Sequence, residues 1–135
     1  MSYARRNDEV RGGAALFDVE RQTVAGRPAL TVRGELDLST AARLDEAADK
    51  ELSNPGSELV VDLTPTTFLD SSGARTLLTV SRKAAAAGVS LYVLCPRTNK
   101  PVRLTVDLLD LGAYVPLVNS VAEIPAGIVR GDSGT

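Results

Sequence analysis

The sequence predicts an α/β domain built on a mostly parallel sheet, because short apolar strands alternate with amphipathic helices along the chain. Two strand patterns come first, at residues 15–22 and 27–37, with the turn-forming segment TVAG between them. Helical and strand patterns then alternate, and each helical connection returns the chain in the same direction. We expect about five strands and about four helices, in a mixed sheet whose first two strands pair antiparallel.

The first helix is predicted within STAARLDEAADKELSNPG, residues 39–56. Its apolar residues recur at helical spacing, its first turn offers Ser39 as a cap, and the Asn-Pro-Gly stretch ends it. The inward residues are expected to be Ala41, Leu44, Ala48 and Leu52. The following ELVVDL is short and continuously apolar, which is typical of a strand covered on both faces.

After a turn at Pro65, a second helix is predicted from Ser71 or Ser72 to Ala87, with Gly88 as its C-terminal stop. Its inward residues are expected to be Leu77, Leu78, Ser81 and Ala85. The run VSLYVLC, residues 89–95, predicts another covered strand.

A third helix is predicted over residues 99–111, with Asn99 as its cap, Pro101 in its first turn and Gly112 after it. Residues 113–118, AYVPLV, predict a short edge strand because they contain a proline. Ser120 and Glu123 then match a capping box, which predicts a terminal helix cut short by the proline and glycine that follow.

The 135 residues fit one domain, which we place at residues 15–126. Residues 1–14 and 127–135 lack an apolar period, so we expect a flexible N-terminal arm and a flexible C-terminal tail.

Composition narrows the classes of function. The 15 basic and 17 acidic residues are dispersed and give a net charge of -2, so no nucleic-acid partner is expected. The single cysteine, Cys95, lies in an apolar run and can form neither an internal disulfide nor a thiolate metal cluster. No apolar run approaches the roughly 20 residues that cross a bilayer. We expect a cytoplasmic protein with no membrane partner, no metal and no cofactor.

A serine pair, Ser71 and Ser72, stands where a strand has ended and a helix begins. A nucleophilic serine needs a base beside it, most often histidine, and the chain has no histidine. The free N–H groups and dipole of a helix start would instead receive a phosphate well. From the residues alone, helix capping is the commoner role of such serines, and turn or cap roles suit Asp37 and Asp70 equally.

Three segments together resemble one family. They are VRGELDLSTA, ELVVDLT followed by FLDSSGARTLL, and PVRLTVDLLDLGAYVPLVNSVAEI, and the resemblance covers about residues 16–124. The family is the STAS domain, and within it the small single-domain anti-sigma factor antagonists.

The resemblance implies a non-catalytic switch. It places phosphorylation on Ser72, by an anti-sigma factor that is a GHKL-type serine kinase, and a phosphatase would then reset the residue. The unphosphorylated form would bind the kinase and release a sigma factor. The predicted partner-binding surface comprises Asp37, Asp70, Ser71, Gly73 and Arg75.

The chain departs from the family pattern in two places. Ala74 and Arg75 follow the motif glycine where the family usually has a bulky apolar residue, and Pro125 breaks the last helix. Arg75 lies three residues beyond Ser72, so both a phosphate contact and a plain solvated arginine stay open.

Other functions stay open as well. The same domain serves as a scaffold in stress-sensing complexes and as a non-catalytic subunit of ABC-type transporters. A receiver-like phospho-aspartate at Asp62 ranks lower, because the acidic cluster that would hold Mg²⁺ is missing after the first strand and the antiparallel opening does not fit that fold.

Overall fold

The structure, a computed structural model, describes residues 16–125. The predicted N-terminal arm, residues 1–14, and C-terminal tail, residues 127–135, lie outside the described residues. The α/β class is confirmed, with a mixed sheet of six strands instead of about five. The described chain holds three α-helices, not four, and two short 3-10 turns.

The sheet has one antiparallel pair and is otherwise parallel. Its main path runs β1 (Asp18–Val24), β2 (Arg27–Leu36), β3 (Glu58–Asp62), β5 (Ser90–Leu94) and β6 (Leu117–Val118). A two-residue turn joins β1 to β2, and its residues Ala25 and Gly26 have φ values of 52° and 79°. Such left-handed turns match the natural twist of a hairpin, which confirms the predicted antiparallel start.

The sixth strand, β4 (Thr66–Leu69), was missed because the segment reads as a turn after Pro65 and is only 4 residues long. It pairs parallel with the second half of β2, beyond the three residues of β2 that pair with β3. The register shifts between Gly34 and Glu35, which pair with Thr66 and Phe68, so β4 carries one extra residue at this irregularity.

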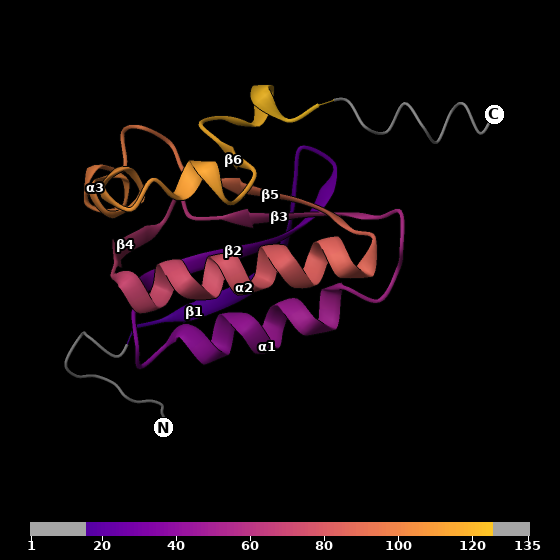
Figure 1. The fold of residues 1–135 in the computed structure, drawn as a ribbon, viewed down its shortest axis with the longest axis horizontal. Helices are drawn as coiled ribbons and strands as arrows, with labels where there is room; N and C mark the ends of the chain where they lie inside the picture. Colours follow the sequence, from indigo (N-terminus) through magenta and orange to yellow (C-terminus); the bar gives the residue numbers. More distant parts are fainter. Residues whose placement is uncertain (1–15, 126–135) are drawn as a thin grey trace.

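The helices are α1 (Ala41–Glu51), α2 (Ser71–Ala87) and α3 (Lys100–Leu108), and the 3-10 turns are Leu111–Ala113 and Val121–Glu123. Helices α1 and α2 lie side by side along one face of the sheet, whereas α3 lies beside β4 (Figure 1). No helix among the described residues is both long and apolar enough to span a bilayer.

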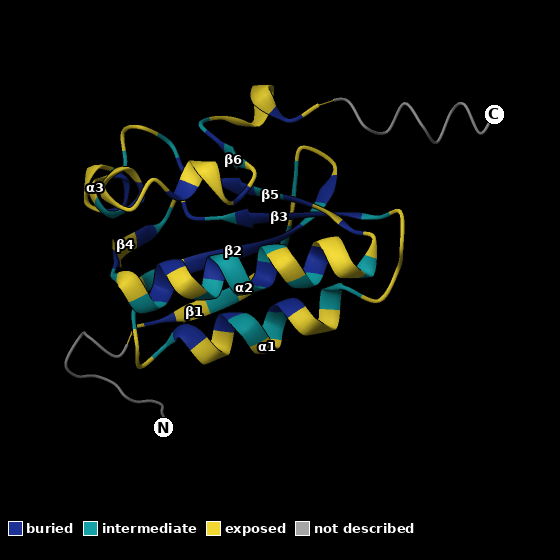
Figure 2. Cartoon of the chain, viewed as in Figure 1, coloured by how far each residue is buried: buried dark blue, intermediate teal, exposed yellow. Residues whose placement is uncertain are grey.

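The main core lies between the sheet and the first two helices, whose inward sides are buried (Figure 2). A second, smaller cluster covers the opposite face of the sheet with Ala29, Val60, Leu94, Val118 and Ile124. Along β3, successive side chains alternate between the two clusters, which confirms that ELVVDL is covered on both faces.

The inward stripe of α2 differs from the predicted one. Leu77 is buried as expected, but Leu78 and Ser81 are half-buried and Ala85 is exposed. The buried residues of the helix are Gly73, Ala74, Leu77, Val80 and Ala84. In a run of alanines, all sides of the helix are similarly hydrophobic. The predicted stripe is therefore rotated by about one residue from the observed one.

The start of α1 and the end of α3 also differ from prediction. Helix α1 is preceded by Thr40 at the N-cap without a side-chain capping bond, and the Ser39 hydroxyl donates to Asp37 instead. Helix α3 ends at Leu108, because Asp110 adopts a left-handed φ of 52° and starts a 3-10 turn that contains Gly112.

The predicted terminal helix is a single 3-10 turn. Ser120 makes no capping bond, and the Glu123 carboxylate accepts from the Asn119 backbone N–H at 2.9 Å, one residue before the expected position. This bond lowers the pKa of Glu123 most, with smaller contributions from the Asn119 side chain and two arginines. The short edge strand before it is confirmed as β6.

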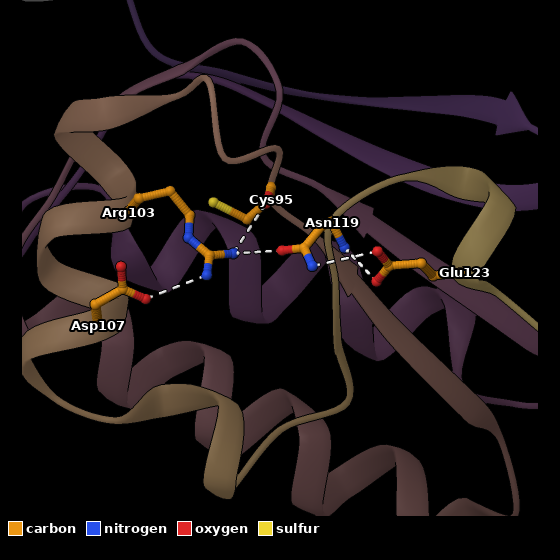
Figure 3. A network of polar contacts seen from close by, with 5 residues as sticks. All are labelled: Cys95, Arg103, Asp107, Asn119 and Glu123. Carbon is orange, nitrogen blue, oxygen red and sulfur yellow. Dashed lines mark hydrogen bonds and ion pairs between the residues drawn. The ribbon is translucent and has the colours of Figure 1, made fainter.

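A buried arginine holds this last segment to the sheet. Arg103 of α3 donates to the Cys95 carbonyl at 3.2 Å, to Asn119 Oδ1 at 2.9 Å and to Asp107 Oδ1 at 3.2 Å (Figure 3). Cys95 is fully buried, as its apolar neighbours predicted, and desolvation raises the pKa of its thiol.

A second buried arginine ties the start of β2 to the same segment. The Arg27 Nε donates to Glu58 Oε1 at 3.0 Å, and its Nη2 donates to the Pro125 carbonyl at 2.6 Å. Both side chains of the ion pair are more than nine-tenths buried, at 9% and 7% exposure. Loss of the arginine would leave the Glu58 carboxylate in an apolar surrounding without a cation.

We therefore expect Arg27→Met to lower the free energy of unfolding by about 3–5 kcal/mol, as measured by urea denaturation. Arg21 and Glu51 form the matched control, because their atoms are also 3.0 Å apart but the arginine is 64% exposed. Arg21→Met should cost no more than about 1 kcal/mol. Equal losses for the two variants would contradict the assigned role of burial.

Candidate functional site

The candidate site lies where β2 and β4 end together. Leu36 and Leu69 are paired as the last residues of the two strands, and the Asp70 N–H donates to the Leu36 carbonyl at 3.3 Å. Asp37 and Asp70 therefore follow the carboxyl ends of neighbouring parallel strands. The structure brings these two predicted site residues to one edge of the sheet, next to the start of α2.

The α2 N-terminus is capped by Asp70, not by Ser71. Asp70 has an extended backbone, and its carboxylate accepts a hydrogen bond from the Gly73 N–H at 2.9 Å. The capping role that the residues alone suggested for the serine pair is wrong for Ser71, because the aspartate one residue earlier occupies the cap position. Ser71 and Ser72 are the first two helical residues, the former exposed and the latter half-buried.

Gly73 lets α2 start directly against β2. A Cβ atom at this residue would lie 2.3 Å from the Leu36 carbonyl oxygen and 2.7 Å from a methyl group of Leu69. The residue is itself buried. Its contribution to the site is therefore the close approach of the backbone, which sets the position of the two serines before it.

The β2–α1 loop folds around the carboxylate of Asp37. Its Oδ1 accepts from the Ser39 N–H at 3.0 Å, from the Ser39 hydroxyl at 2.8 Å and from the Thr40 hydroxyl at 3.2 Å. The Ser39 hydroxyl contributes most to holding the pKa of Asp37 below its ordinary range, while desolvation opposes the shift. Asp37 is thus a fixed negative charge at neutral pH.

The start of α2 can receive one anion. Among the described residues, the N–H groups of Ser71 and Ser72 have no hydrogen-bond acceptor, whereas that of Gly73 is taken by Asp70. A phosphate on Ser72 would meet these two free donors and the positive end of the helix dipole. It would also lie on the same turn as the Asp70 carboxylate, which opposes a second negative charge there.

Arg75 is exposed on the next turn of α2, and it forms no ion pair or hydrogen bond with any residue of the range 16–125. It borders a shallow groove of about 300 Å³. The groove is lined by Ser71, Ala74, Arg75, Leu78, Leu109, Leu111 and Tyr114. The last three come from the segment after α3, so the site extends beyond the serine motif.

Sequence reasoning missed the exposed apolar side chains near this site. Leu38 follows Asp37 and is 79% exposed, and Tyr114 in the groove is 65% exposed. Leu104, Leu108 and Leu109, in and just after α3, are also exposed. The segment VRLTVDLLDL carries more apolar residues than one inward stripe of α3 requires, and this excess was the available signal.

Asp62, the aspartate considered for a receiver-like site, forms a local turn. Its Oδ1 accepts from the Thr64 N–H at 2.9 Å and from the Thr64 hydroxyl at 2.6 Å. Across residues 16–125, no group of three or more His, Cys, Asp or Glu side chains is arranged to hold a metal ion.

Comparison with known proteins identifies the family. Residues 18–124 match the STAS domain. The anti-sigma-F factor antagonist RsfB of Mycobacterium tuberculosis is 40% identical over 106 residues, which cover 78% of this chain and 84% of RsfB. The chain belongs to the STAS domain family. The resemblance seen in the sequence is therefore confirmed at the level of the family.

Solved structures share the fold of this STAS domain. An anti-sigma factor antagonist from Mycobacterium paratuberculosis superposes with a TM-score of 0.66 at 23% identity, covering 84% of this chain and 92% of that one. The Bacillus cell fate determinant SpoIIAA in its phosphorylated form gives a TM-score of 0.51 at 19% identity, covering 85% and 98%. At these identities the similarity establishes the fold alone.

The contacts of Gly73 predict a large effect for one methyl group. Gly73→Ala should lower the free energy of unfolding by about 2–3 kcal/mol, because backbone oxygen cannot move aside as a flexible side chain can. Gly112→Ala is the control, since a Cβ there would meet only the flexible side chain of Leu117, whose nearest atom is a methyl group at 3.3 Å. Urea denaturation should show less than about 1 kcal/mol for the control. A Gly73 variant as stable as wild type would contradict the packing role.

The hydrogen bonds to Asp37 predict a pH effect with a defined sign. Because its pKa is lowered by folding, the carboxylate stabilises the native state above about pH 4 and loses this effect as the pH falls through the folded pKa. An NMR titration should give a pKa for Asp37 below about 3.9, and Ser39→Ala should raise it. Asp37→Asn identifies the resonance. An unchanged pKa in Ser39→Ala would exclude the hydroxyl as the main cause.

Proposed function

We propose that this STAS domain is an anti-sigma factor antagonist that switches partners through Ser72. The unphosphorylated form binds an anti-sigma factor that is a GHKL-type serine kinase, and this binding releases a sigma factor. Phosphorylation of Ser72 ends the complex. The observation that carries the proposal is the 40% identity to the antagonist RsfB over most of both chains. The intact serine pair at the exposed start of α2 supports it.

The choice of Ser72 depends on the register of the Asp-Ser-Ser-Gly motif. Exposure alone would favour Ser71, because its side chain is the more accessible of the two. Both serines lie within one turn that is fixed by the Asp70 cap and the Gly73 packing. A kinase that reads this turn can therefore discriminate between two neighbouring hydroxyls by their orientation.

The proposed partner surface surrounds this turn. Asp37 and Asp70 supply negative charge, and Ser71 and Arg75 lie at the edge of the groove. Leu38 and Tyr114 add exposed apolar area of the kind that interfaces bury. Gly73 belongs to this surface through its backbone geometry, because the residue itself is buried.

A phosphate on Ser72 would change this surface more than it would change the fold. Phosphoserine carries a charge of about -1.5 to -2 at neutral pH. It would add to the carboxylate of Asp70 on the same turn and to that of Asp37 at the neighbouring strand end. Any partner surface complementary to the unmodified form would then face a large, strongly hydrated anion.

The proposed phosphorylation and dephosphorylation of Ser72 require two enzymes, a kinase and a phosphatase. Neither a catalytic role nor a bound cofactor is proposed for this chain, so the kinase supplies the phosphoryl transfer. Phosphate monoesters hydrolyse extremely slowly without catalysis, so a phosphatase must restore the free Ser72 hydroxyl.

The test starts with the partner that unphosphorylated protein retains from a lysate of the source cells, identified by mass spectrometry. Incubation of the two purified proteins with ATP should add one phosphate, on Ser72. Phosphorylation should then reduce the affinity measured by calorimetry roughly a hundredfold, which corresponds to about 3 kcal/mol of repulsion and desolvation. Ser72→Ala should bind without being released by ATP.

Ser71→Ala is the matched control, because it removes a hydroxyl from the same turn and should still be phosphorylated and released. Circular dichroism should show the same helix content for all variants and for the phosphoprotein. Phosphate on Ser71, or equal affinity before and after modification, would overturn the switch. Retention of a transporter permease instead of a kinase would favour the transporter-subunit function.

A further inference from the structure

Helix α3 contacts the backbone that leads into the first turn of α2 through one side chain. Residues 70–73, which form this turn, are called the switch turn below. The hydroxyl of Thr105 donates a hydrogen bond to the Leu69 carbonyl at 2.7 Å. Leu69 is the last residue of β4 and directly precedes the Asp70 cap. The peptide that enters the switch turn is therefore held from two sides, by Thr105 at the Leu69 carbonyl and by β2 at the Asp70 N–H.

A second side chain anchors the beginning of the same segment. Both hydrogen bonds of the Asn99 amide nitrogen go to backbone carbonyls, that of Leu63 at 3.0 Å and that of Thr66 at 2.8 Å. Asn99 stands at the N-cap of α3 but makes no capping bond to its own helix. Its amide instead closes the β3–β4 connection, so Asn99 occupies the predicted cap position without making a side-chain capping bond.

The helix that carries these groups is itself firmly placed. Val102 and Val106 of α3 are buried in the main core, and Arg103 ties the helix to the Cys95 carbonyl and to Asn119 (Figure 3). Thr105 and Asn99 thus connect an anchored helix to a four-residue strand that has one pairing partner among the described strands. Without them, the backbone of β4 would be hydrogen-bonded to β2 alone among the secondary-structure elements of the described chain, although Leu69 would stay buried in the core.

From these contacts we infer that Thr105 and Asn99 are positioning residues for phosphorylation of Ser72. The inference rests on the proposed function. They act through the backbone of Leu69 and Thr66, to which their hydrogen bonds go, and not through the Ser72 hydroxyl. Phosphoryl transfer requires the hydroxyl in line with the transferred group, and a displacement of about 1 Å can reduce such a rate up to a hundredfold. The Thr105 hydroxyl therefore affects the rate of transfer more than kinase binding.

The kinetic test compares Thr105→Val, which keeps the shape and removes the hydroxyl, with Thr105→Ser, which keeps the hydroxyl. With the captured kinase and ATP, Thr105→Val should lower kcat at least fivefold with KM within twofold of wild type. Thr105→Ser should restore kcat to within twofold of wild type.

Asn99→Asp, which removes the amide donors, should also lower kcat. Val80→Ala, a core truncation remote from the turn, controls for lost stability through its melting temperature.

A second measurement needs no kinase. Native-state hydrogen exchange should be at least threefold faster at the Gly73 amide in Thr105→Val than in wild type, and normal in Thr105→Ser. Wild-type kcat in Thr105→Val, an equal kcat loss in Val80→Ala, or unchanged exchange at Gly73 would each overturn the inference. If wild-type protein is not phosphorylated at all, the proposed function fails, and the exchange result still decides whether Thr105 positions the turn.

Discussion

The paired ends of β2 and β4 are the constraint on which the site depends. Leu36 and Leu69 close the two strands at the same level, and the Leu36 carbonyl accepts the Asp70 N–H. The same carbonyl approaches Gly73 so closely that no side chain fits there. One backbone oxygen thus fixes both the cap of α2 and the packing of its first turn. The two serines take their positions from a junction that is itself almost entirely main chain.

Buried charge performs a different task in the segment that follows β6. Arg27 and Arg103 are both buried, and each donates to the segment that follows β6. A two-residue strand and a single 3-10 turn contribute little apolar area, so polar contacts with strict geometry hold them in place. These contacts hold the segment so that Ile124 packs in the second apolar cluster, which covers the other face of the sheet.

The sequence predicted the fold class well because its strongest signals are periodic. The apolar runs of β3 and β5 and the stripe of α1 depend on local spacing, and their main features are confirmed. Strand β4 was missed because four residues give no period, and its pairing partner, the second half of β2, lies more than 30 residues earlier in the chain. Other features depend on which of several nearby polar residues makes a given hydrogen bond, and only tertiary geometry decides this. Examples are the Asp70 cap and the contacts of Asn99 and Thr105.

The strands at the margins of the sheet also limit how copies of this domain can meet one another. Strand β1 carries the exposed, charged side chains of Asp18, Glu20 and Arg21 along its length, and β6 is only two residues long. Strand β4 is flanked by α3. Among the described strands, one free edge therefore carries exposed charges and the other is only two residues long, and both features disfavour intermolecular sheet extension. Under the proposed exchange of partners, each release would free the domain without exposing a strand edge that templates self-aggregation.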